Sequence, residues 1–81
     1  MKLSPSSHGG IEVEYDTGMV VFFYASTPVA ARLGPRGPIL VCIDLVDARS
    51  RSRARAWIAE QNSLGKIKVT FKILKQMVEL C

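Results

Sequence analysis

Two stretches of this chain are apolar at nearly every position, Met19–Ser26 (MVVFFYAS) and Ile39–Val46 (ILVCIDLV). A strand with polar residues at alternate positions needs to be buried on only one face of its sheet. A strand that is apolar on both sides needs other elements packed against both faces. These stretches are therefore predicted to be central strands of a sheet that packs against other elements. The 81 residues of the chain suffice for one such domain.

The other segments before residue 39 predict a strand, a turn and a short helix. Ile11–Tyr15 alternates apolar and acidic residues, as in a strand with one solvent-facing side, and the hairpin-turn residues Asp16-Thr17-Gly18 follow it. Thr27–Gly34 begins with a capping Thr and a first-turn Pro and ends in Gly, which predicts a short helix. Residues 1–10, rich in Ser, Pro and Gly over Leu3–Gly10, are expected to be a flexible N-terminal arm ahead of a single domain at 11–81.

The second half of the chain predicts one main helix and one further strand. The helix begins at Asp47 or Ser50 and runs to about Asn62, with Trp57 as its core anchor. Lys66–Leu74 then alternates basic or polar residues with apolar ones, which predicts a strand. The order is β-β-short α-β-α-β, so we expect an α+β fold of two layers, with about four mostly antiparallel strands and one main helix.

One long helix covers only one face of such a sheet. The short helix expected at Thr27–Gly34 leaves part of the other face open, and apolar residues make up 48% of the chain. A second chain or a bound partner is the simplest cover for the remaining apolar surface, and of a homodimer and a monomer the homodimer is expected.

The charges of this chain are distributed unevenly. Residues 1–47 carry three basic and five acidic side chains, a net charge of −2, whereas residues 48–81 carry eight basic and two acidic side chains, a net charge of +6. Four of these cations crowd the start of the predicted main helix, at Arg49, Arg51, Arg53 and Arg55. A helix N-terminus is already positive, so this arrangement is unfavourable for stability and is consistent with binding to an anionic partner.

The candidate partner-binding residues are all basic, because forked arginine donors suit phosphate and carboxylate groups. Lysines on the last predicted strand join the arginines if their strand face lies nearby, although protection of an edge strand from unwanted pairing is the favoured interpretation of the lysines. Solvated side chains at a helix end are the alternative reading of the arginines. The residues proposed on this basis are Arg49, Arg51, Arg53, Arg55, Arg36, Lys66, Lys68 and Lys72.

Three short motifs have an ordinary structural explanation. Asp16-Thr17-Gly18 resembles the aspartic-protease tripeptide, but it lies between two predicted strands, where a hairpin turn is the better interpretation. Gly34-Pro35-Arg36-Gly37 resembles the GxxG loop of KH domains, but a strand follows it, and two prolines remove backbone donors. Val20–Tyr24 loosely resembles the aromatic strand of an RRM without its Gly and basic positions, so core packing is favoured.

The sequence contains no constellation typical of an enzyme or of a metal or cofactor site. The single histidine, His8, lies in the expected arm, and the two cysteines, Cys42 and Cys81, form neither a disulfide framework nor a zinc pattern. The longest strictly apolar run, Met19–Ala25, is far shorter than the roughly 20 residues that span a bilayer. We therefore expect a cytoplasmic protein without a cofactor and without membrane association.

Three functional hypotheses follow, in order of preference. The first is a small non-enzymatic binding protein that contacts nucleic acid or a nucleoprotein through the basic start of its main helix. The second is a compact inhibitor or adaptor that binds another protein, like the small anti-defence (anti-CRISPR-like) proteins of phages and mobile elements, an analogy of size and style alone. The third is an enzyme that uses Asp16 or Asp44 across a dimer interface.

Overall fold

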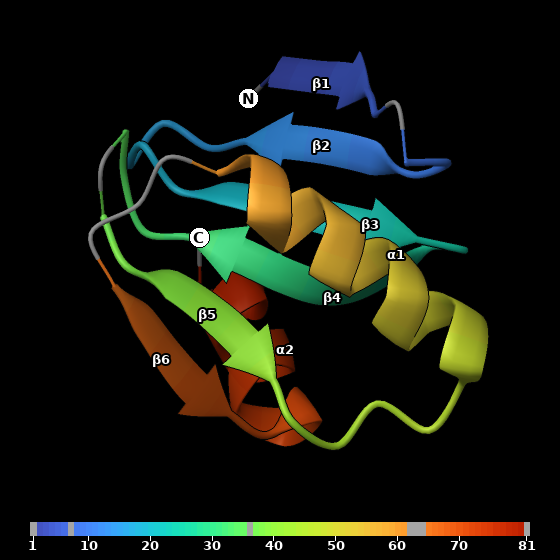
Figure 1. Cartoon of the computed structure of the whole chain (residues 1–81). Coiled ribbons are helices and arrows are strands. Elements are labelled where there is room, and N and C mark those ends of the chain that lie inside the picture. The colour runs from blue at the N-terminus through green and yellow to red at the C-terminus, as the bar shows by residue number, and fades with distance from the viewer. Residues whose placement is uncertain (1, 7, 36, 62–64, 81) are drawn as a thin grey trace.

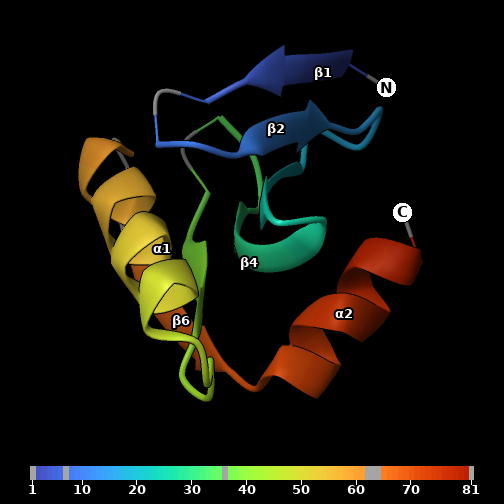
Figure 2. The ribbon, with the colours of Figure 1, turned by 90° about the vertical axis from the view of Figure 1, so that its right-hand side faces the viewer.

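The computed structural model describes residues 2–6, 8–35, 37–61 and 65–80. Within these residues the chain forms a six-stranded mixed sheet with a helix on each face (Figures 1 and 2). The strands lie in chain order, neighbours are antiparallel as far as β5, and β6 is parallel to β5. The elements are β1 (Lys2–Pro5), β2 (Ile11–Glu14), β3 (Val20–Tyr24), β4 (Thr27–Arg32), β5 (Ile39–Cys42), α1 (Ala48–Glu60), β6 (Lys66–Val69) and α2 (Phe71–Glu79).

The predicted α+β class is confirmed, but in place of the expected two layers, about four strands and one main helix, the described residues form six strands with a helix on each face of the sheet (Figure 2). The β2–β3 hairpin forms as expected, with Gly18 at a φ of 90° and the Tyr15 N–H donating to the Met19 carbonyl over 2.8 Å. The main helix also forms as expected, and the Asp47 carboxylate caps it. The strand predicted over Ile39–Val46 is shorter and ends at Cys42.

The short helix expected at Thr27–Gly34 is wrong, because Thr27–Arg32 form strand β4. Ala25 and Ser26 both have positive φ, 53° and 64°. Two consecutive residues of this kind form the tight reverse turn that joins two antiparallel strands. The chain therefore returns directly along β3, and pairing with β3 outweighs the local helix signals.

The strand predicted over Lys66–Leu74 is correct only as far as Val69, after which the chain turns into α2. Thr70 caps this helix, its hydroxyl accepting from the Ile73 N–H over 3.3 Å. Asp44 accepts from the Phe71 N–H over 2.7 Å. The backbone donors freed at the start of α2 are thus satisfied from two directions, which stabilises a helix here.

The segment expected to be a flexible arm contributes strand β1, which pairs antiparallel with β2 along Lys2–Pro5. The loop that follows approaches α1, with His8 Nε2 lying 2.9 Å from Glu60 Oε2 but without hydrogen-bond geometry. Contacts with the neighbouring strand therefore order residues whose composition alone indicates a loop.

Two apolar cores lie on opposite faces of the sheet. In the first, Phe22 and Ala30 pack beneath Trp57 of α1. In the second, Val21 and Ala31 pack beneath α2. Adjacent residues of a strand point to opposite faces, so one strand supplies both cores. The second face is thus covered over β4 and β5 by α2 of the same chain, where the sequence led us to expect a partner.

Candidate functional site

The rotation of α1 about its axis decides where its arginines point. Trp57 is buried, stacks on Phe22 with 5.5 Å between ring centroids and 4° between ring planes, and donates from Nε1 to Glu12 Oε1 over 2.6 Å. Ser50 and Ala54, on the same side of the helix, are also buried. Because this side is held against the sheet, all four arginines of α1 are exposed.

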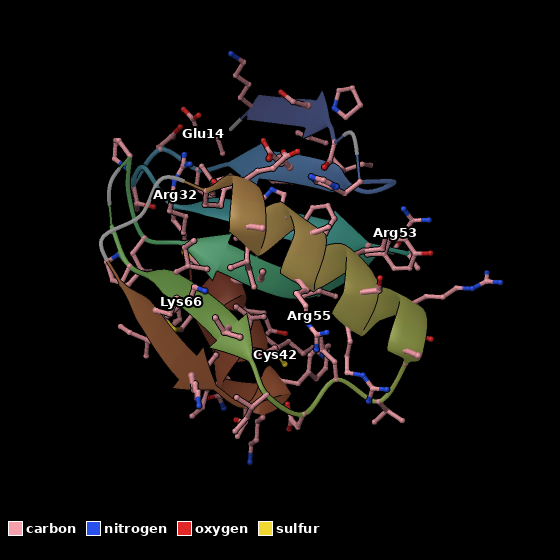
Figure 3. The ribbon with its side chains drawn as sticks, in the orientation of Figure 1. Glu14, Arg32, Cys42, Arg53, Arg55 and Lys66 are labelled. Carbon is pink, nitrogen blue, oxygen red and sulfur yellow. The ribbon has the colours of Figure 1, made fainter. Side chains whose placement is uncertain are left out.

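The helix divides the four arginines into two pairs. At about 100° per residue, Arg51 and Arg55 lie on one flank of the buried side, and Arg49 and Arg53 lie on the other. Figure 3 shows Arg53 and Arg55 on opposite sides of α1. Arg53 lies beside the β1–β2 loop, since its Cζ is 3.8 Å from the position that a Cβ would take at Gly9. The crowding seen in the sequence is therefore not a single cluster.

The Arg51–Arg55 flank borders an open groove of about 510 Å³ between α1 and strands β4 to β6. The floor of this groove is mainly aliphatic, and three cationic side chains lie along it. Among the described residues that line the groove, none carries a carboxylate. The floor residues used below are Val29, Val41, Leu45, Ala54 and Ile58, and the cations are Arg51, Arg55 and Lys66. We call this site the basic groove.

The parallel pairing of β6 with β5 brings lysines to the α1 side of the sheet. Lys66 is in register with Ile39, and Lys68 is in register with Val41. Ile39 and Val41 both pack in the core beneath α1, so Lys66 and Lys68 share that face of the sheet. Lys72, by contrast, lies on α2, across the sheet from α1 (Figure 2). The structure therefore brings Lys66 to the arginines but keeps Lys72 away from them, and Arg36 lies outside the described residues.

Within the part of the chain that the structure describes, no ion pair is formed by Arg49, Arg51, Arg53 or Arg55. Arg51 instead donates from Nη1 to the Leu45 carbonyl over 3.1 Å, which ties its guanidinium to the loop before α1. The nearby Asp47 is engaged in capping. The Arg49 backbone N–H and then the Ser50 hydroxyl donate to the Asp47 carboxylate, and these hydrogen bonds lower its pKa.

The two carboxylates considered for catalysis, Asp44 and Asp16, lie at a helix start and in a hairpin turn. Asp44 accepts from the Cys42 thiol over 3.2 Å and from the Phe71 N–H over 2.7 Å, and these hydrogen bonds, in that order, lower its pKa. Asp16 lies in the β2–β3 turn. Burial raises the pKa of the Cys42 thiol, which keeps the sulfur protonated at neutral pH. In the described ranges, no three His, Cys, Asp or Glu residues gather as metal ligands would.

Sequence reasoning identified the cations of this site but missed its floor. Val29 and Val41 meet beneath α1 only because residues 27–32 form a strand between β3 and β5. The alternation of Lys66 and Lys68 was visible in the sequence, but only the parallel register places these lysines beside α1. The strand at residues 27–32 depends on a turn with positive φ at Ala25 and Ser26. The sequence did not predict this turn, because Ala and Ser rarely adopt positive φ.

No helix within the described residues has the length and apolar character required to cross a bilayer. Comparisons with protein-family models, with curated protein sequences and with solved structures gave no match.

Proposed function

We propose that the protein is a small non-enzymatic binding module of the cytoplasm that contacts nucleic acid or a nucleoprotein through the basic groove and the exposed side of α1. The observation that carries this proposal is that Arg51, Arg55 and Lys66 line one groove without a carboxylate among its described lining residues. Like charges held together in this way repel one another unless an anion lies among them.

Arginine and lysine have complementary roles in such a site. A guanidinium offers two parallel donors to a phosphate, whereas an ammonium acts as a mobile point charge. Arg55 comes from a helix and Lys66 from a strand, so a chain of phosphates that follows the groove meets donors from two elements. Phosphate contacts position a nucleic acid without reading its sequence. We therefore expect binding that depends strongly on salt and weakly on sequence.

Fluorescence anisotropy with labelled DNA and RNA over about 50 to 300 mM salt tests this proposal. Each phosphate neutralised contributes roughly 0.9 for duplex DNA, or roughly 0.7 for a single strand, to the slope of log affinity against log salt. The combined variant Arg51→Ala, Arg55→Ala, Lys66→Ala should lower that slope by at least about 1.4, the contribution of two phosphates of a single strand.

The matched control is the double variant Lys72→Ala, Lys75→Ala, because these exposed lysines belong to α2, on the other side of the sheet. This control should leave the affinity and the salt dependence nearly unchanged. Binding that is indifferent to salt, or that survives the triple variant at full strength, would rule out the basic groove as the nucleic-acid site.

A second candidate function is a compact protein-binding inhibitor or adaptor, such as a phage or mobile-element anti-defence protein. The observation that favours it is the exposure of two large apolar side chains in the loop before α1: Ile43, which lines the groove, is 59% exposed, and Val46, which lies outside it, is 92% exposed. Exposed apolar residues of this size are typical of protein interfaces. Affinity capture after nuclease treatment tests it: a partner that is lost on Val46→Lys, outside the groove, but kept by the groove variant supports this candidate.

We also propose a homodimer, although less apolar surface is left for the second copy than the sequence suggested. α2 packs against β4 and β5, while Leu3 on β1 and Ile11 on β2 remain 63% and 47% exposed. The register places Leu3 opposite Val13, and Ile11 opposite Phe23 of the second core, so both belong to the α2 side of the sheet. A solution mass for the wild type and for Leu3→Lys, Ile11→Lys decides whether this surface pairs two copies.

A further inference from the structure

We propose that nucleic acid occupies the basic groove as a single strand, with phosphates on Arg55 and Lys66 and at least one base against the aliphatic floor. This inference rests on the proposed function and specifies the form of its ligand. A phosphate backbone alone would use the cations and leave the partly exposed floor residues, Val41, Leu45 and Ile58, in water. A flexible anion that carries a flat, weakly polar group at every repeat uses both.

The dimensions of the groove agree with this occupant. Its volume of about 510 Å³ lies within the range of roughly 300–1,000 Å³ typical of small-molecule sites, so a nucleotide fits. A duplex cannot place a base there, because its bases are stacked inside a convex surface of sugars and phosphates. Sequence-tolerant single-strand proteins commonly combine a positively charged groove with a surface for unstacked bases.

The surface for the base differs from the usual aromatic platform. Among the described lining residues no side chain is aromatic, and the floor includes Val41 and Ile58. Arg51 supplies the one planar group that is held in place, because its Nη1 donates to the Leu45 carbonyl over 3.1 Å. Guanidinium planes serve as stacking surfaces for unpaired bases. Arg51 is thus assigned to the base, while Arg55 and Lys66 are assigned to the backbone.

The test compares three ligands of equal length by fluorescence anisotropy: a single strand, an abasic strand with the same phosphates, and a duplex. The single strand should bind at least about tenfold more tightly than either of the others. Arg51→Lys keeps the charge and removes the plane, so it should weaken binding of the single strand but not of the abasic strand. Lys66→Ala should weaken both by the same factor.

Ile58→Ala tests the floor, and Val46→Ala is its control, because Val46 is 92% exposed and lies outside the groove. Ile58→Ala should weaken single-strand binding severalfold, and Val46→Ala should not. Should Ile58→Ala unfold, Arg51→Lys still decides, since Arg51 is exposed.

Equal affinity for the single strand and the abasic strand would overturn the base contact and leave phosphate binding intact. Tighter binding of the duplex would also overturn it, and would indicate that α1 enters a major groove. Failure to bind any of the three ligands would overturn the proposed function itself.

Discussion

Leu74 and its neighbour Ile73 exchange roles depending on whether residues 70–79 form a strand or a helix. The alternation of the sequence puts Ile73 on the apolar side of a strand with Ile67 and Val69, and Leu74 on the opposite side. In the structure, both residues belong to α2: Leu74 is 0% exposed, on the side of the helix that packs in the second core, whereas Ile73 is 46% exposed. Replacing each by alanine therefore tests the helix directly.

The expected losses in the free energy of unfolding differ severalfold between the two alanine variants. Leu→Ala at a fully buried site removes the transfer free energy and leaves a cavity, for a loss of about 2–5 kcal/mol. Ile73 is only about half buried, so its truncation forfeits roughly 1 kcal/mol, of which the better helix propensity of alanine returns a few tenths. A chain of 81 residues has a free energy of unfolding of roughly 4–12 kcal/mol, so Leu74→Ala removes a large share of it.

Urea unfolding, followed by the fluorescence of Trp57, measures these losses. Trp57 is the only tryptophan and is buried in the core on the opposite face, so it reports loss of the whole fold rather than fraying of α2. At a denaturant slope of roughly 1 kcal/mol per molar, Leu74→Ala should lower the midpoint by at least about 2 M, and Ile73→Ala by less than about 1 M.

If Leu74→Ala is unfolded without denaturant, Leu74→Met supplies a smaller step of less than about 1.5 kcal/mol. A larger loss at Ile73 than at Leu74 would refute the helix and restore the strand. Equal losses would show that α2 does not pack on the sheet by its Leu74 side.

Two further predictions concern pH and backbone packing. Hydrogen bonds lower the pKa of Asp44 and Asp47 below the ordinary 3.8, so both carboxylates stabilise the fold above about pH 4 and this stabilisation is lost as the pH falls. Urea midpoints between about pH 7 and pH 3 should therefore fall less in Asp44→Asn, Asp47→Asn than in the wild type, and identical profiles would contradict this. Gly10→Ala should destabilise the fold by about 1–3 kcal/mol or more, because a Cβ there would lie 2.2 Å from the Phe23 carbonyl oxygen. Gly65→Ala, with nothing within 4 Å of its Cβ, is the control, and equal midpoints would contradict the clash.

The sequence by itself determined the class of the fold and the place of its central strands. The apolar stretches at Met19–Ser26 and Ile39–Val46 supply β3 and β5 in the interior of the sheet. Asp47 and Trp57 fulfil their expected roles as cap and core anchor of α1. These features depend on side-chain periodicity and on capping groups close in sequence, which are local properties of the chain.

The tertiary structure decided the assignments in which local signals compete. Thr27–Arg32 carries helix-start signals but becomes a strand because a two-residue turn returns it onto β3. Thr70 falls in an alternating pattern but starts a helix because Asp44, 26 residues earlier in the sequence, meets the Phe71 N–H. Local propensities differ by only about 1 kcal/mol or less per residue, so a few long-range contacts override them.

For the basic groove, too, some features follow from the sequence and others only from the tertiary structure. Its cations could be named from the sequence, because charged residues crowded at a helix start are visible without a fold. The grouping of these cations could not be predicted. Arg53 and Arg55 lie on opposite sides of α1 (Figure 3), and the parallel register of β6 places Lys66 in the groove with Arg55 only. The groove itself exists only where β4, β5, β6 and α1 meet. Concavity is a property of packed elements, and no single segment of the chain encodes it.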